Sequence, residues 1–200
     1  MKKQACIAAI ILALAMVWGC DDGDDAEEAV AASNADILSL AWKNYGDGFH
    51  FLAKTKFEEL IDKGAYPAEA HAGLAWCQAS LFQLDDALDE FQEALDNNPS
   101  AALAGDIRAG LSFIYDAQNR PDDCLAAIAL VDPAWDFEHR TDLDYNDLIL
   151  LKAMNHYAQG DLDDSLSEVK RLDPTFDADT TTTEGRAALA GKIEALRAEV

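Results

Sequence analysis

Two stretches of this 200-residue chain carry the same residues at a spacing of 34. Both contain a Leu-Ala-Trp triplet, followed by an alanine and a phenylalanine at matching distances. The matched residues are Leu40, Ala41, Trp42, Ala53 and Phe57 in the first stretch and Leu74, Ala75, Trp76, Ala87 and Phe91 in the second. A repeat of this length predicts stacked helical hairpins, because one hairpin cannot bury its apolar face alone. The spacing therefore predicts an all-α chain of repeated helical pairs.

Two further units follow with looser spacing, 37 and then 41 residues on. Their matched residues are Leu111, Ser112, Tyr115, Cys124 and Ile128, and then Ala153, Gly160, Ser165 and Val169. An aspartate pair recurs at Asp85, Asp122 and Asp163, and residues 131–135 are echoed by residues 172–176. The predicted units are residues 34–67, 68–101, 102–138 and 143–176.

The second unit resembles a tetratricopeptide repeat (TPR). The resemblance rests on Leu74-Ala75, on Ala87 four residues before Phe91, and on a closing proline. It implies small residues where the two helices of a hairpin cross, an aromatic side chain between hairpins, and a proline at the end of the unit. The implied packing positions are Leu40, Ala41, Ala53, Phe57, Leu74, Ala75, Ala87, Phe91, Pro99, Ser112, Cys124, Ala153 and Ser165. The expected fold is an α-solenoid of about four TPR-like hairpins over residues 34–176, with a C-terminal capping helix within residues 177–200.

The third and fourth units depart from the family pattern. Cys124 and Ser165 stand where the family has alanine, so we expect these units to pack less regularly. Residues 135–142, with the sequence WDFEHRTD, form a longer connection than the family needs.

The pattern also predicts the helix boundaries. First helices are expected near residues 34–46, 68–82, 102–117 and 143–158, and second helices near residues 49–63, 84–97, 121–131 and 162–172. A final helix is expected to open with a capping box at residues 180–184 and to run to about Glu199. Its apolar side would carry Ala187, Leu189, Ile193 and Leu196.

The N-terminus has the pattern of a secretory signal. Two lysines precede an uncharged apolar run that is too short for the roughly 20 residues of a spanning helix, and Gly19-Cys20 closes it. The ending resembles a bacterial lipobox, which implies cleavage after residue 19 and a lipid on Cys20. A cleaved protein without lipid and an uncleaved anchor are the alternatives. Residues 20–33 are acidic, lack aromatic residues and are predicted to be a disordered tether.

The charge of the chain disfavours nucleic acid as a partner. Without Lys2 and Lys3 of the predicted signal, 13 basic and 38 acidic side chains remain, a net charge of −25. Nucleic-acid binding depends on neutralising phosphates with basic side chains. The acidity suits solubility, or a basic partner that the field attracts.

The TPR frame predicts a binding groove. The ninth position of each first helix would line the concave face, and it holds Trp42, Trp76, Phe113 and Met154, with Tyr45 and Tyr157 nearby. Aromatic residues and methionine are common on peptide-binding surfaces. The alternative is that these side chains fill contacts between neighbouring first helices, and the sequence does not separate the two. Acidic residues, including Glu69, Asp106, Asp116 and Asp147, would surround the groove.

No motif in the sequence predicts catalysis or a resident metal. The aspartate pairs fall in the first turns of second helices, where negative side chains complement the helix dipole. Asp142, Asp144 and Asn146 start like a calcium loop, but Asp147 and Ala153 replace the required glycine and glutamate. The four histidines form no metal-binding pair, and Cys77 and Cys124 are expected to be buried thiols, with a disulfide as the alternative. We expect no enzyme activity and no cofactor.

These features together predict a lipoprotein scaffold of the bacterial envelope. It would lie on the periplasmic side of the inner or outer membrane and bind a protein or peptide segment in its groove. Proteins that look like this include accessory subunits of outer-membrane β-barrel assembly and pilotins of secretion systems. The alternatives are a soluble extracytoplasmic adaptor, a self-associating solenoid, and a metal-dependent envelope enzyme.

Overall fold

A computed structural model describes residues 32–198 of the chain. The predicted signal, the lipidation site Cys20 and nearly all of the predicted tether lie outside the described residues. Within them, no helix combines the length and the hydrophobicity that a membrane crossing requires.

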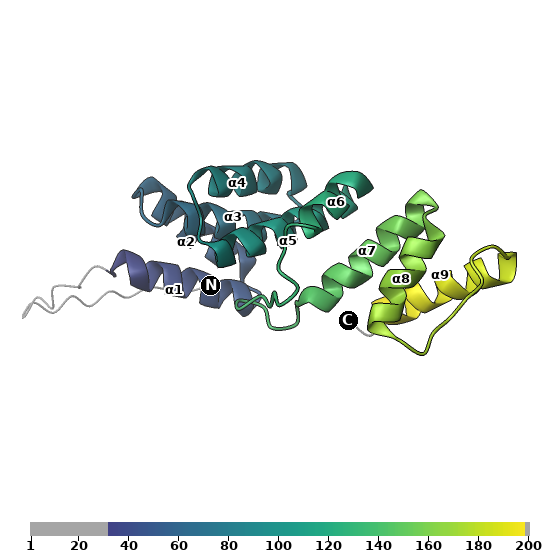
Figure 1. Cartoon of the computed structure of the whole chain (residues 1–200). Helices are drawn as coiled ribbons and strands as arrows, with labels where there is room; N and C mark the ends of the chain where they lie inside the picture. Colours follow the sequence, from purple (N-terminus) through teal and green to yellow (C-terminus); the bar gives the residue numbers. More distant parts are fainter. Residues whose placement is uncertain (1–31, 199–200) are drawn as a thin grey trace, which may run out of the picture. The chain divides into compact units, whose positions relative to one another are not determined.

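The described residues fold into nine α-helices and no named strand (Figure 1). The helices are α1 (Asn34–Gly46), α2 (His50–Asp62), α3 (Pro67–Ser80), α4 (Leu84–Asp96), α5 (Ala101–Ala117), α6 (Pro121–Ile128), α7 (Tyr145–Gln159), α8 (Leu162–Leu172) and α9 (Thr183–Arg197). All nine correspond to helices that the sequence predicts. The largest difference is at α6, which ends at Ile128 rather than near residue 131, because the chain turns there into the long connection to α7.

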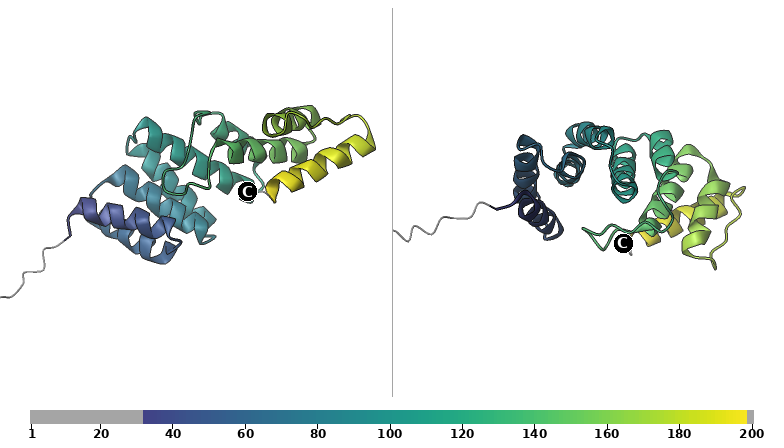
Figure 2. Two further views of the ribbon diagram at one scale, coloured as in Figure 1. Left: turned by 90° about the horizontal axis from the view of Figure 1, so that it is seen from below. Right: turned by 60° about the vertical axis from the view of Figure 1, so that its left-hand side comes forward.

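Helices that follow each other in the sequence pack against each other (Figures 1 and 2). The odd-numbered helices also contact one another in order, from α1 to α3, α5, α7 and α9. The even-numbered helices contact only their sequence neighbours. This is an all-α arrangement of sequential pairs, consistent with repeated helical hairpins. We refer to the consecutive odd helices α1, α3 and α5 as the first-helix layer.

Local hydrogen bonds explain where several helices begin. Ser33 and Asp36 form a capping box at the start of α1, and Asp144 and Asp147 form one at the start of α7. The second box accounts for the pattern that starts like a calcium loop. Thr182 caps α9 by accepting a hydrogen bond from the Gly185 amide. The predicted capping box with Glu184 does not form, because Gly185 and not Glu184 is the third residue of the helix.

Aromatic rings set the distance between successive hairpins. A Cβ atom added to Gly73 of α3 would lie 2.2 Å from the ring of Phe57 on α2. A Cβ added to Gly110 of α5 would lie 2.3 Å from the ring of Phe91 on α4. Real Cβ atoms do not approach this closely, so each glycine gives its ring the room to pack on the helix backbone.

The thirteen predicted packing positions are buried with two exceptions. Leu40 is 45% exposed although its counterpart Leu74 is 4% exposed, and Pro99 is partly exposed. The difference between the two leucines has a structural reason: α3 follows a packed hairpin, whereas α1 is the first helix of the described chain. Cys77 and Cys124 are both buried free thiols.

The recurring aspartates connect successive units. The first aspartate of each pair accepts a hydrogen bond from a side chain at the C-terminal end of the next odd helix or in the loop before α9. Asp85 accepts from Gln118, Asp122 accepts from Gln159, and Asp163 accepts from Thr180. In the first unit, Lys54 of α2 donates a hydrogen bond to Gln83 in the turn before α4. The aspartates therefore do more than complement the helix dipole.

Candidate functional site

The connection between α6 and α7 returns across the first-helix layer. We call residues 133–143 the strap. Trp135 and Phe137 are 8% and 0% exposed and His139 is half-buried, while Asp136 and Glu138 between them are exposed. Residues 138–139 and 141–142 lie in turns, so the strap is a bent segment whose alternate side chains face the helices. The right-hand view of Figure 2 shows the connection on the side of α1 and α5 away from the even helices.

Each inward side chain of the strap meets a different helix of the layer. Trp135 donates a hydrogen bond from Nε1 to Oδ1 of Asp106 on α5, at 2.8 Å. The ring of Phe137 stacks on Trp76 of α3, with centroids 4.5 Å apart. The ring of His139 stacks on Trp42 of α1 at 3.8 Å, with the two planes 6° from parallel. One aromatic residue of the strap thus lies on each of three successive odd helices, in the reverse order of the chain.

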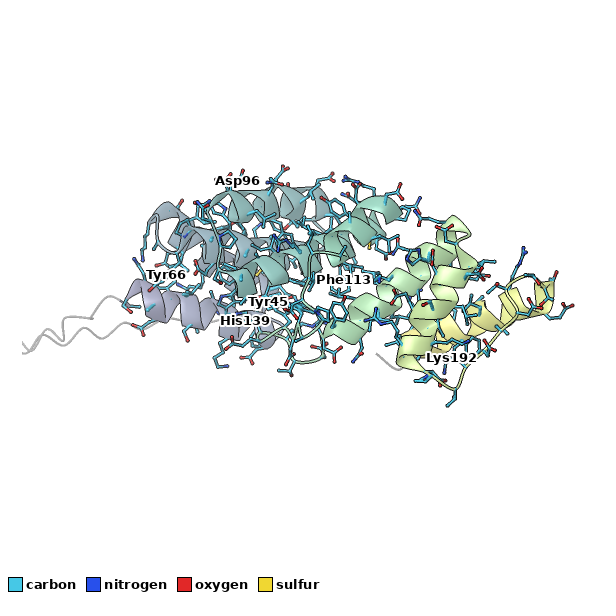
Figure 3. All side chains as sticks on the ribbon, viewed as in Figure 1. Tyr45, Tyr66, Asp96, Phe113, His139 and Lys192 are labelled. Atoms are coloured by element: carbon cyan, nitrogen blue, oxygen red, sulfur yellow. The ribbon has the colours of Figure 1, made fainter. Side chains whose placement is uncertain are left out.

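The strap covers three of the six residues that the sequence places on a groove wall. Trp42, Tyr45 and Trp76 are 9%, 1% and 4% exposed, and all three have ring contacts with Phe137. Figure 3 labels Tyr45 and His139, whose rings both lie near that of Phe137. Phe113 is partly buried near Trp76. In this part of the molecule the aromatic residues are packed, and the side chains they pack against belong to the chain itself.

The other two predicted groove residues lie apart from the strap. Met154 and Tyr157 of α7 are partly exposed and line a pocket of about 190 Å³ together with Ala190, Ile193 and Glu194 of α9. The structure therefore divides the predicted wall into a covered part on α1 and α3 and a more open part between α7 and α9.

Burial changes the titration of groups around the strap. Desolvation raises the pKa of Asp106 to about 6, although the hydrogen bond from Trp135 opposes the rise. Desolvation lowers the pKa values of His50 and His139, which favours their neutral forms. The Tyr45 hydroxyl has a raised pKa for the same reason; Ser80 and Arg140 lie near enough to offset part of it, but neither forms a hydrogen bond of standard geometry with it.

Several buried polar atoms of α1, α2 and α3 have no hydrogen-bond partner among the described residues. They are Nε1 of Trp76, Oε1 of Gln78, the Tyr45 hydroxyl and Nδ1 of His50. Trp76 and Gln78 are 4% and 6% exposed, so water reaches neither of them freely. Unpaired buried polar groups cost stability, which makes this group unusual for a region that serves packing alone.

Sequence reasoning did not find the strap residues. Trp135, Phe137 and His139 were visible only as part of a connection longer than the family needs. Their alternation with Asp136 and Glu138 is a strand-like signal, and it was the feature that could have identified them. Three of the acidic residues predicted around the groove have local structural roles. Asp106 accepts a hydrogen bond from Trp135, Asp116 accepts one from Asn155, and Asp147 caps α7.

A second apolar surface lies at the turns of the first two hairpins. Phe49, Phe51, Leu52 and Phe82 are four of the seven large apolar side chains exposed in the described chain, and Phe82 is 88% exposed. Lys54 donates to Gln83 at 3.3 Å, which brings the start of α2 beside the turn that holds Phe82. The sequence analysis did not single out these residues.

One group of side chains has the composition of a metal site. Oxygen and nitrogen atoms of His156, Asp161 and Asp164 lie within 4.8 Å of one another, and no other such group occurs among the described residues. Both aspartates are exposed at the start of α8, where the helix dipole opposes a cation.

Comparisons with known proteins do not assign the chain to a family. No family model matches the sequence, and no curated protein is significantly similar to it.

Proposed function

We propose that this protein is a non-catalytic TPR-type scaffold of the bacterial envelope. Four hairpins, α1–α2 to α7–α8, would form the solenoid and α9 would cap its last face. The scaffold would bind an extended segment of another protein along its odd helices. A lipid on Cys20 would hold it on the periplasmic side of a membrane, as an accessory to an assembly or secretion complex.

The strap is the observation that carries this proposal. The first-helix layer already holds a bent segment of the chain, with Trp135 on α5, Phe137 on α3 and His139 on α1. A surface that accepts such a segment from its own chain has the spacing and the apolar character to accept one from another chain. The more open part between α7 and α9 would extend this surface with Met154 and Tyr157.

The assignment to TPR-type hairpins is supported by the register of the packing. The small residues expected at the helix crossings are buried, from Ala41 and Ala53 in the first unit to Ala153 and Ser165 in the fourth. Phe57 and Phe91 pack on glycines of the following helices at the same register. These two observations favour repeated hairpins of one design over nine unrelated helices.

The absence of catalysis is proposed on the chemistry of the available groups. Burial raises the pKa values of the Cys77 and Cys124 thiols to about 12, which leaves almost no thiolate at neutral pH. The half-buried His139 stacks on Trp42 rather than facing a hydroxyl or thiol nucleophile.

A crosslinking experiment in the native membrane tests the binding site. A photoreactive amino acid would replace Met154 on the odd-helix surface, Phe82 in the exposed apolar turn, or Glu93 on the outer side of α4. We expect one reproducible protein adduct from position 154 and none from position 93. Adducts from position 82 alone would contradict the proposed site. The absence of an adduct from all three positions would contradict the presence of a stable protein partner.

A labelling experiment tests the anchor separately. The full-length protein should incorporate labelled fatty acid, and the Cys20→Ser variant should not. A wild-type protein without label would favour the soluble adaptor over the lipoprotein.

A further inference from the structure

We propose that the strap is a displaceable occupant of the first-helix layer, and that the partner segment takes its place. The partner would be an extended stretch of another protein with aromatic side chains at alternate positions and basic flanks. This inference rests on the proposed function, and it names the ligand that the covered surface fits.

The strap keeps its own backbone hydrogen bonds when considered apart from the helices. The Phe137 amide donates to the Leu143 carbonyl and the Tyr145 amide donates to the Trp135 carbonyl, both at 3.1 Å. An antiparallel bridge joins Asp136 to Asp144. Arg140 forms an ion pair with Asp142 inside the same turn. The Phe137–Leu143 bond and the Arg140–Asp142 pair lie within the strap, and the other two interactions join it to the start of α7, so none of them is made to α1, α3 or α5.

The attachment to the first-helix layer is made by side chains. Within the described part of the chain, no backbone hydrogen bond joins residues 133–143 to α1, α3 or α5. The contacts are the Trp135–Asp106 hydrogen bond and the stacking of Phe137 and His139. Another segment with rings at the same spacing can make all of these contacts, since none depends on the connection to α6 or α7.

The strap leaves hydrogen-bonding capacity unused on the surface that it covers. Nε1 of Trp76, whose ring stacks on Phe137, is a buried donor without a partner among residues 32–198. Supplying a partner to a buried polar group removes the cost of leaving it unpaired. A segment that carries an acceptor near Trp76 would bind more favourably than the strap does.

Charge indicates the flanks of the partner. The chain has a net charge of −23, and the outer side of the strap presents Asp136 and Glu138. At the far end of the layer, Asp106 offers a buried acceptor. A segment with an aromatic donor or a basic side chain at Asp106, and with lysine or arginine outside the groove, would be attracted to this surface.

A peptide copied from the strap serves as the ligand in the first experiment. The labelled peptide covers residues 131–144, and its control carries serine at the positions of Trp135 and Phe137. It is titrated into full-length protein in mild detergent, as wild type and as the Trp135→Ser/Phe137→Ser variant. Because a tethered segment competes at an effective concentration of the order of millimolar, we expect the variant to bind at least about tenfold more tightly than wild type.

Phe176→Ser is the matched receptor control. Residues 172–176 echo residues 131–135, and Phe176 stands where Trp135 stands, but it packs in the core of α7–α9. This variant loses one aromatic residue at the same register without freeing the first-helix layer. We expect it to bind the peptide as weakly as wild type.

The second experiment follows the strap in the wild-type protein and needs no strap variant. Incorporated 5-fluorotryptophan reports on Trp42 and Trp76 in the layer and on Trp135 in the strap, with resonances assigned by single tryptophan-to-phenylalanine changes. On saturation with the peptide, the Trp135 resonance should move to the solvent-exposed position. The Trp42 and Trp76 resonances should stay at buried positions.

The outcomes separate this inference from the proposed function. If the variant binds the peptide but Trp135 of the saturated wild type does not move, the strap is fixed and only the displacement is wrong. If the variant is folded by circular dichroism and does not bind, the layer is not a segment-binding surface and both proposals fail there. If the variant does not fold, the wild-type titration decides alone, and an unmoved Trp135 overturns the displacement. A molecular mass that rises with concentration and falls on adding peptide would assign the surface to the strap of a second copy, and would overturn the partner named here.

Discussion

The molecule has two regions that hold their helices together differently. The helices α1–α6 and the strap share a core of 29 buried apolar side chains, which also takes in part of α7. The core between α7, α8 and α9 has five: Leu150, Ala153, Val169, Leu189 and Ile193. Around this smaller core, polar interactions are prominent, with Lys152 paired to Glu168 and Lys192 paired to Asp173.

The difference follows from the side chains at the hairpin contacts. In the first region, Phe57 and Phe91 pack on glycine, so backbones approach closely over a large ring. At the equivalent register before α7, Ile128 replaces the phenylalanine and Leu151 replaces the glycine. Two branched aliphatic side chains therefore stand where the first region has a large ring packed on a glycine. One repeat pattern can therefore be filled by two packing solutions, and only the first leaves an aromatic surface for the strap.

Removal of Phe137 should show the largest difference between the regions. Phe137 is fully buried at the centre of the larger core, so Phe137→Ala should lower the free energy of unfolding by about 4 kcal/mol. Phe176 is only partly buried, so Phe176→Ala should cost about 1–2 kcal/mol. Urea denaturation followed by circular dichroism would measure both. Equal losses would show that the strap is not an integral part of the core.

A methyl group at a ring contact should have the next largest effect. Gly110→Ala would place a Cβ 2.3 Å from the Phe91 ring, and the overpacking should cost about 2–3 kcal/mol. Gly191→Ala in α9 is the matched control, because no atom lies within 4 Å of the added Cβ.

The control should move in the opposite direction. Alanine is favoured over glycine inside a helix, so Gly191→Ala should raise stability by about 0.5–1 kcal/mol. If Gly110→Ala were also stabilising, the aromatic-on-glycine account of the first region would be wrong.

Asp106 should make the stability of the first region depend on pH. Its pKa is about 6 in the folded protein against 3.8 ordinarily, so the folded state holds this proton more strongly. Stability from this group is complete below about pH 4, declines as pH rises to about 6, and stays low above that. Asp106→Asn keeps an acceptor for Trp135 but removes the charge.

The variant should therefore be more stable than wild type at pH 7. We expect a gain of about 1 kcal/mol, because solvent reaches part of the carboxyl group, and a difference that vanishes near pH 4. Thermal unfolding of both proteins at pH 4, 5, 6 and 7 would measure it. A difference that does not change with pH would refute the burial of the charged group.

The smallest effect should come from an ion pair of the second region. Glu168 binds Lys152 and Arg171, and Glu168→Gln keeps its shape while removing its charge. The expected loss is about 0.5–1 kcal/mol in low salt, and less in 1 M NaCl because salt screens the pair. Glu93→Gln, on the exposed side of α4, should cause no loss. A loss of stability that did not change with salt would show that Glu168 stabilises the protein by packing and not by its charge.

The helices and their order were predictable because they depend on local patterns. Several kinds of residue act within one or two helical turns of their own position. They are the repeated small residues such as Ala41 and Ala75, the aspartate pairs and the capping residues. The start of α7 at Tyr145 follows from the Asp144–Asp147 capping box, which needs no tertiary contact. The candidate site was only half predicted: Trp42 and Trp76 were placed on the odd-helix surface, but whether they face solvent or other side chains was left open.

By itself, the sequence determined an all-α chain of sequential helical pairs and the boundaries of most helices. These depend on hydrophobic period and helix capping, which short stretches encode. Only the tertiary structure decided that Trp135, Phe137 and His139 lie on α5, α3 and α1. Residues 137 and 76 are 61 positions apart, and no periodicity joins them. Their contact arises because stacked hairpins present one aromatic row, and because the α6–α7 connection is long enough to fold back along it.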